Sequence, residues 1–303
     1  GTPASGNLTL SPSPAGTLDI LAGGAIALNA NLALSDMDPR YVPDAANPQG
    51  TTTQTATARP AVPDLLIYPF STLGNIHASV PVHAADRAPA RILAASGDIV
   101  GVNQAQGKVL NVSKAVDIRA GRDIRNLTVF VQHNDAADIS RIEAGRDFVY
   151  DSTSERRDRA LVRVGGPGRL EVVAGRDIDL GTSGGIVSRG NIDNANLPAG
   201  GADIHLAAGA GAGGIDYDGA LDRLLDALLD DPDEATLWQA RWLAGDATLD
   251  AAAAVSAVRA VQQLDAAARR MQVRDWQFAA LRETGRDANQ PGNPYAGDFA
   301  RGY

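Results

Sequence analysis

Cysteine is absent from the 303-residue chain, so the protein can form neither a disulfide bond nor a thiolate metal site. The sequence also lacks a run of about 18 apolar residues, and we therefore expect no transmembrane helix and no membrane insertion. The first residues, GTPASGNLTL, lack the charged and apolar regions of a signal peptide. Basic residues are outnumbered, which gives a net charge of −9 and a pI near 4.9. Because an acidic protein repels phosphate backbones, we expect no nucleic-acid partner.

Aromatic residues are scarce, at 5% of the chain, whereas glycine is abundant, with 32 copies. This combination predicts many turns and a core built from Val, Ile, Leu and Ala. The length of the chain predicts about two domains.

A pentapeptide recurs along the first two thirds of the sequence. It reads AGRDI at residues 120–124 and 174–178, and AGRDF at residues 144–148. In each copy a short alternating strand precedes a corner of small residues, and another alternating strand follows it. The apolar residue after each corner recurs every 25, 24 and 30 residues, and weaker copies occur at 18–28, 91–101 and 202–215; these apolar residues are Ile99, Ile124, Phe148 and Ile178.

The period decides the architecture. Repeats of roughly 20–50 residues build solenoids, propellers or arrays. The alternation of apolar and polar residues excludes most helical solenoids, and a propeller blade needs about 40 or more residues. The sequence therefore predicts a right-handed parallel β-helix over residues 1–217. From the period of about 24 residues we expect roughly seven to nine coils, stacked about 4.8 Å apart. The 73 residues from Ile26 to Ile99 equal about three such periods.

Each residue of the pentapeptide has an expected role in this architecture. We expect the glycine to adopt a positive φ at the corner and the aspartate to accept nearby backbone N–H groups. The following Ile or Phe faces the core. The arginine points to solvent and pairs with aspartates of neighbouring coils, and each such pair contributes about 0–1 kcal/mol. The repeat is therefore predicted to be structural.

Two segments depart from the period. Residues 35–63 are rich in Pro, Thr, Ala and Asp, which predicts a long loop excursion from the coils. Arg156–Arg159 predicts a short charged turn between two coils.

Residues 218–286 have helical periodicity and predict a subdomain of about three helices. Asp231 is expected to cap the second helix, with Pro232 as its first residue and an end near Gly245. A single long helix is expected from about Thr248 to Thr284, with Gly285 just beyond its end. Residues 287–303 are expected to form an irregular tail. The first predicted helix carries an apolar stripe of Leu221, Leu224, Leu225, Leu228 and Leu229.

Two glycine-containing motifs resemble catalytic or cofactor signatures. Gly181–Gly185 fits G-x-S-x-G, but a nucleophile elbow requires a helix after the serine, and a strand is predicted there. Gly209, Gly211 and Gly214 fit G-x-G-x-x-G, but a dinucleotide site requires a second strand, and helices follow. We predict a coil corner and an exit from the last coil, respectively.

Two further sets of side chains could bind metal. The four histidines, at 77, 83, 133 and 205, contain no HExxH pair and no evident third ligand. Asp123, Asp147 and Asp177 could stack along one edge, where they would raise one another's pKa or bind calcium. Their place in the repeat favours corner residues instead. We therefore predict no catalytic, cofactor-binding or metal-ligating residue.

The repeated unit resembles the recurrent units of filamentous haemagglutinin-like exoproteins of bacterial two-partner secretion. Two other stretches are similar to the C-terminal region of one subgroup of this family. They are LTLSPSPAGTLDILAGGAI followed by LSDMDPRYVP, and GGIDYDGAL with the closing FAALRETGRDANQPGNPYAGDFARGY. The resemblance covers most of the chain. In that subgroup the chain continues beyond the equivalent of Tyr303, so we expect this sequence to be a fragment.

The resemblance implies a secreted or cell-surface protein with a structural and adhesive role and no enzymatic activity. It also implies export through an outer-membrane transporter, which would bind a region not present here, and a glycan or protein receptor on a host or bacterial surface. Two alternatives stay open. One is a β-helix enzyme that degrades polysaccharides, although all three tryptophans lie in the helical region rather than on the coils. The other is a stalk that delivers a C-terminal toxin in contact-dependent competition.

Overall fold

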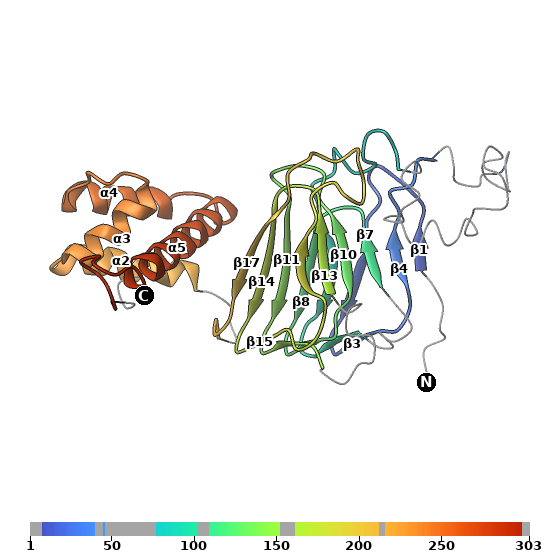
Figure 1. The fold of residues 1–303 in the computed structure, drawn as a ribbon, viewed down its shortest axis with the longest axis horizontal. Coiled ribbons are helices and arrows are strands. Elements are labelled where there is room, and N and C mark those ends of the chain that lie inside the picture. Colours follow the sequence, from blue (N-terminus) through green and yellow to red (C-terminus); the bar gives the residue numbers. More distant parts are fainter. Residues whose placement is uncertain are drawn as a thin grey trace. The chain divides into compact units, whose positions relative to one another are not determined.

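The computed structural model describes residues 8–39, 45, 77–101, 109–151, 161–211 and 216–298. The chain divides into two compact units, residues 1–214 and 215–303. The first unit is a parallel β-helix and the second is helical, which confirms the predicted fold class (Figure 1). Most of the predicted excursion at 35–63 and the turn at Arg156–Arg159 lie outside the described residues.

Three parallel sheets form the walls of the β-helix, and successive strands along the chain join them in turn. Sheet A contains β1 (Leu8–Leu10), β4 (Leu32–Leu34), β7 (Leu110–Val112), β10 (Val129–Gln132), β13 (Leu161–Gly165) and β16 (Gly185–Ser188). Sheet B contains β2 (Asp19–Ala22), β5 (Ala90–Ala94), β8 (Val116–Ala120), β11 (Ile139–Ala144), β14 (Arg169–Ala174) and β17 (Asp203–Ala207). Sheet C contains β3 (Ile26–Leu28), β6 (Ile99–Gly101), β9 (Ile124–Arg125), β12 (Phe148–Val149) and β15 (Ile178–Asp179).

The number of coils differs from the prediction. The longest sheets hold six described strands, fewer than the expected seven to nine coils. Ile26 pairs directly with Ile99, so the 73 residues between them form one coil with a long insertion rather than three coils. The insertion leaves the stack after β4 and returns at β5, which makes the interruption longer than residues 35–63. Apolar alternation is weak in the intervening sequence, and counting periods across it was wrong.

In-register stacking lines up identical side chains in the core. On sheet B, Ile20, Ile92, Ile118 and Ile142 face one another across neighbouring strands. On sheet C the predicted column after the corner is confirmed, since Ile99, Ile124 and Phe148 are almost completely buried. Burying one such side chain stabilises the fold by about 1.5–3 kcal/mol. The repeat in sequence is therefore a repeat in core packing.

The outer face of sheet B carries alternating charges in the same register. Its column runs Asp19, Arg91, Asp117, Arg141 and Glu171 from coil to coil. The Arg141 guanidinium lies 3.1 Å from the Glu171 carboxylate. Opposite charges directly across from each other stabilise a sheet, whereas like charges destabilise it. The register that stacks the isoleucines therefore also favours charge pairing.

The corner glycines are required for a different reason from the one predicted. Gly121, Gly145 and Gly175 do not have positive φ, so the expectation of a left-handed corner is wrong. A Cβ atom at Gly121 would instead collide with the Ala95 carbonyl oxygen of the preceding coil. A Cβ at Gly145 would collide in the same way with the carbonyl of Gly121. Close approach between stacked backbones excludes every larger side chain here.

The helical unit contains four described helices rather than about three. They are α2 (Tyr217–Asp230), α3 (Glu234–Ala244), α4 (Ala251–Gln262) and α5 (Ala266–Ala288). The single helix expected from Thr248 to Thr284 breaks between Gln262 and Ala266. Asp265 causes this break by starting a new helix, because its carboxylate accepts the N–H of Ala268 at 3.0 Å. None of these four helices is long and apolar enough to span a membrane.

Two predicted helix boundaries are also wrong. Asp233, not Asp231, caps α3 and accepts the Thr236 N–H at 2.7 Å. Asp231 is the C-cap residue of α2, so Pro232 lies between the helices. Gly285 lies inside α5, which continues to Ala288, and the side chains of Thr284 and Ala288 on either side of it are buried. The predicted end of α3 at Gly245 is confirmed by its left-handed φ of 68°.

The core of the helical unit follows the predicted stripe on α2 with one exception. Leu221, Leu224 and Leu228 are buried, but Leu229 is 55% exposed. Trp276, Val273 and Ala280 of α5 pack into the same cluster. A narrow stripe on each helix is therefore sufficient to form this core.

Candidate functional site

The aspartates of the repeat form a hydrogen-bonded ladder along one corner of the β-helix. Asp98 accepts the backbone N–H of Asp123 at 3.1 Å, and Asp123 accepts that of Asp147 at 3.3 Å. Asp147 accepts that of Asp177 at 3.3 Å. Each aspartate therefore bonds one coil onward rather than within its own bend. This geometry explains why the aspartate recurs with the glycine.

As predicted, the arginine of a repeat pairs with the aspartate of the preceding coil. The Arg146 guanidinium makes two hydrogen bonds to Asp123, at 3.0 and 2.8 Å, and Arg176 binds Asp147 in the same way. Burial opposes ionisation of Asp123, but the hydrogen bonds from Arg146 and Arg125 outweigh it and hold its pKa at about 2. The alternative of stacked carboxylates with raised pKa is therefore wrong for Asp123. A carboxylate held ionised by two arginines cannot donate a proton as a general acid at neutral pH.

Ser183 of the G-x-S-x-G match lies in a tight turn between two strands. Its hydroxyl donates to the Leu180 carbonyl at 2.6 Å and accepts the Gly185 N–H at 3.1 Å. β15 precedes the turn and β16 follows it, so the strand-to-helix geometry of a nucleophile elbow is missing. The predicted coil corner is confirmed.

The described part of the glycine run packs onto the corner below it. The N–H groups of Gly209, Ala210 and Gly211 donate to carbonyls of the preceding corner, at 2.8, 3.1 and 2.9 Å. A phosphate site needs such N–H groups to be free. These three donors are already used, and Gly214 lies outside the described residues. The first half of the motif therefore has a structural role.

A buried polar cluster fixes the base of the excursion between β4 and β5. Asp36 has no exposed surface, and its carboxylate accepts the side-chain amides of Gln132 at 2.8 Å and Asn194 at 2.9 Å. It also accepts the Val82 N–H at 3.0 Å and lies 3.3 Å from Nδ1 of His77. These partners come from distant parts of the chain. The sequence contains no local signal for the cluster, and sequence reasoning missed it.

A partly buried ion pair also lies near the return of the excursion. The Lys114 ammonium is almost completely buried and pairs with Asp86. His83 lies 3.8 Å from the same carboxylate. Burial, followed by the charge of Lys114, lowers the pKa of His83. Lys114 follows strand β7, whereas His83 and Asp86 lie where the excursion returns to the coils. These contacts therefore join the excursion to the coils.

The third buried histidine, His133, connects neighbouring coils. Its Nδ1 lies 2.8 Å from the Pro167 carbonyl, and its Nε2 lies 2.7 Å from the Ser140 hydroxyl. These partners favour a neutral ring protonated on Nδ1, and burial lowers the pKa of His133. Within the described ranges no three His, Asp or Glu side chains converge as a metal site requires.

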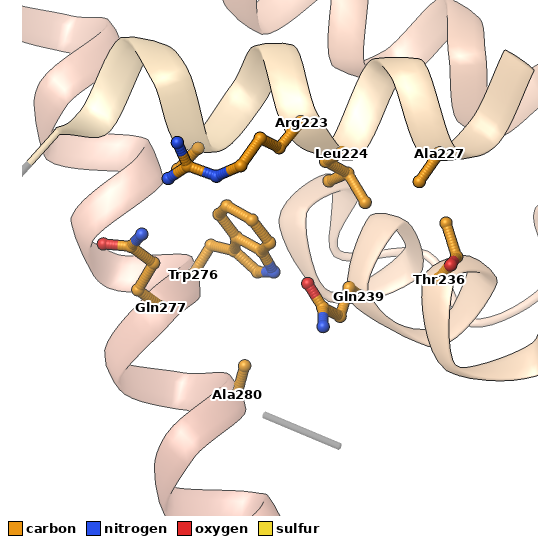
Figure 2. Close-up of a pocket in the computed structure, with 9 residues that line it drawn as sticks. Arg223, Leu224, Ala227, Thr236, Gln239, Trp276, Gln277 and Ala280 are labelled. Carbon is orange, nitrogen blue, oxygen red and sulfur yellow. The ribbon is translucent and has the colours of Figure 1, made fainter. Parts of the chain in front are cut away.

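A pocket of about 250 Å³ lies in the helical unit, between α2, α3 and α5 (Figure 2). Trp276 is 7% exposed, and its indole N–H has no hydrogen-bond partner among the described residues. Leaving a buried donor unpaired costs about 1–3 kcal/mol. Such a cost is unusual in a helix core and marks the pocket as a candidate site. The pocket is lined by Ala220, Arg223, Leu224, Ala227, Thr236, Gln239, Trp276, Gln277 and Ala280.

A second concave surface of about 350 Å³ lies at the C-terminal end of α3. Trp238 and Trp242 are one turn apart there, with ring centroids 6.1 Å apart in an edge-to-face arrangement. Trp242 is 38% exposed. Arg241 also lines this surface. Tryptophan and arginine are the residues most enriched at the energetic centres of protein interfaces.

Comparison with known proteins identifies no relative: no family model, no curated protein and no solved structure matches the chain.

Proposed function

We propose that the chain is a structural and adhesive segment of a large secreted or surface-exposed bacterial exoprotein, and that its coils perform no catalysis. The β-helix is the shaft, and the helical unit offers the contact surface. The sequence resemblance to two-partner secretion exoproteins supports this class. Export through an outer-membrane transporter, and a glycan or protein receptor, are parts of the same proposal.

The observation that carries the proposal is the corner ladder. A β-helix enzyme that cleaves polysaccharides needs carboxylates free to donate or accept a proton. Asp123 and Asp147 are each committed to an arginine and to a backbone N–H of the next coil. The repeat therefore uses its charged residues to hold coils together. Such a use suits a rigid shaft.

The aromatic pair on α3 supports an adhesive role for the helical unit. Trp238 and Trp242 line one concave surface with Arg241, and a contact surface needs such large side chains near solvent. The buried cluster around Asp36 holds both ends of the excursion to the coils. That arrangement favours a second contact surface, since loops carried on a rigid scaffold commonly bind partners.

The test is binding of the purified full chain to a glycan array and to cultured epithelial cells, with a parallel turnover assay on acidic polysaccharides. We expect binding without turnover. Replacing both indoles, in Trp238→Ser/Trp242→Ser, is expected to weaken binding roughly tenfold or more. Leu229→Ser changes another exposed apolar side chain of the same unit and is the matched control. Turnover that disappears in Asp147→Asn would instead identify a β-helix enzyme.

A further inference from the structure

We propose that the pocket between α2, α3 and α5 binds a compact apolar molecule that carries an uncharged carbonyl oxygen, which the indole N–H of Trp276 recognises. This site is separate from the surface formed by Trp238 and Trp242. The proposal does not depend on an adhesive function for the chain.

The shape of the pocket sets the size of the ligand. Its walls include three alanines and one leucine, which leave space where larger side chains would fill it. Ala220, Leu224 and Ala227 recur at helical spacing on one face of α2. Ala280 of α5 lines the same pocket (Figure 2). A cavity of about 150 Å³ holds a benzene ring. A pocket of about 250 Å³ therefore accommodates a ring together with a short substituent.

The unpaired donor sets the chemistry of the ligand. Figure 2 shows the indole nitrogen of Trp276 directed toward Gln239, into the space between the three helices. Indole can only donate, so its partner must be an acceptor. A ligand that supplies this acceptor removes a penalty already present in the protein. Gln277 lines the same pocket and can bind a remaining polar group of a substituent.

The charges around the pocket favour an uncharged acceptor over an anion. Arg223 is the one charged residue in the lining, and it lies 3.4 Å from Asp216. Acidic side chains outnumber basic ones across residues 216–298. The field of the unit therefore repels a carboxylate, whereas a carbonyl oxygen carries no net charge.

The three indole N–H signals of the ¹⁵N-labelled full chain provide the test. Trp→Phe variants at each position assign the signals. The probes are acetanilide, which has a ring and a neutral carbonyl; benzoate, which has a charged acceptor; and phenethylammonium, which has no acceptor. N-acetyl-phenylalanine amide is added to compare a peptide-like source of the same chemistry with a free small molecule.

We expect acetanilide to shift the Trp276 signal selectively, with a Kd on the order of 1 mM for so small a probe. Benzoate and phenethylammonium should bind at least about fivefold more weakly than acetanilide, because benzoate is charged and phenethylammonium has no acceptor. Stronger binding of the peptide-like probe than of acetanilide would identify a peptide as the source of the ligand.

Two variants keep the proposal falsifiable. Trp276→Phe removes the donor and should weaken acetanilide binding about fivefold or more. Ala227→Phe fills the pocket from an exposed position of α2 and should abolish binding while α-helical content is unchanged. Trp242→Phe should bind like the wild type. The proposal is overturned if acetanilide shifts all three indoles equally, if benzoate binds more tightly than acetanilide, or if Ala227→Phe binds normally.

Discussion

In both units an aspartate side chain accepts a backbone N–H, but the two residues are much farther apart in the sequence in the β-helix than in the helical unit. In the β-helix, Asp123 accepts the backbone N–H of Asp147, one whole coil away. In the helical unit, Asp233 accepts the N–H of Thr236, three residues away. Both bonds satisfy a backbone donor, but the first joins separate parts of the chain and the second completes one helix. A change in a coil should therefore disturb its neighbours, whereas a change at a helix start should stay local.

The largest expected effect tests this contrast at the corner glycines. Gly145→Ala places a Cβ atom against the carbonyl of Gly121 and should destabilise the β-helix by about 3 kcal/mol. Gly23→Ala is the matched control, because a Cβ there meets nothing within 4 Å. Urea unfolding followed by circular dichroism measures both. Tryptophan fluorescence follows the helical unit in the same samples, since all three tryptophans lie there. Equal stability of the two variants would contradict the stacking explanation.

The buried cluster on the excursion should give the next largest effect. Asp36→Ala leaves the Val82 N–H and the amides of Gln132 and Asn194 without their acceptor. Because these donors are wholly or partly buried, we expect a loss of about 1–3 kcal/mol. Limited proteolysis should then cut the chain faster near residues 77–86. Unchanged unfolding would show that Asp36 is dispensable to the fold.

The N-cap of α3 should give a smaller effect, because its hydrogen bond lies within one helix. Asp233→Ala removes the acceptor of the Thr236 N–H and should cost about 1 kcal/mol. Tryptophan fluorescence should report this loss, because Trp238 and Trp242 lie on the same helix. Asp230→Ala, which lies in the last turn of α2, is the matched control. A loss as large as that of Asp36→Ala would remove the distinction between the two units.

The smallest expected effect is a difference between the two units in the stability that each loses at acid pH. Burial lowers the pKa of both His83 and His133 below the ordinary value of about 6.5. The unfolded chain therefore binds protons first as the pH falls below about 6.5, and the β-helix loses stability there. Residues 216–298 contain no histidine, so the helical unit should lose none by this route. Urea unfolding at pH about 7.5 and about 5.5 measures the difference. His133→Gln should reduce it, and a greater loss in the helical unit would contradict the assignment.

The sequence predicted those features of the molecule that repeat. Ile124 and Phe148 were placed in the core because the period repeats a packing position. The role of Gly145 was not predictable, because its steric constraint comes from a neighbouring coil rather than from its own corner. The cluster at Asp36 joins residues 96 and 158 positions apart, and no local pattern marks such contacts. The pocket at Trp276 depends on how three helices pack, which their separate apolar stripes do not specify.

The absence of cysteine permits a direct test of the central claim, that the repeats stack one coil on the next in the described register. Arg119 and Glu143 are register partners on the outer face of neighbouring strands β8 and β11, whereas Arg119 and Arg141 are two residues out of register. We predict that Arg119→Cys/Glu143→Cys forms an intramolecular disulfide rapidly under mild oxidation and that Arg119→Cys/Arg141→Cys does so much more slowly. Equal rates, a reversed order or only intermolecular dimers would contradict the coil stack.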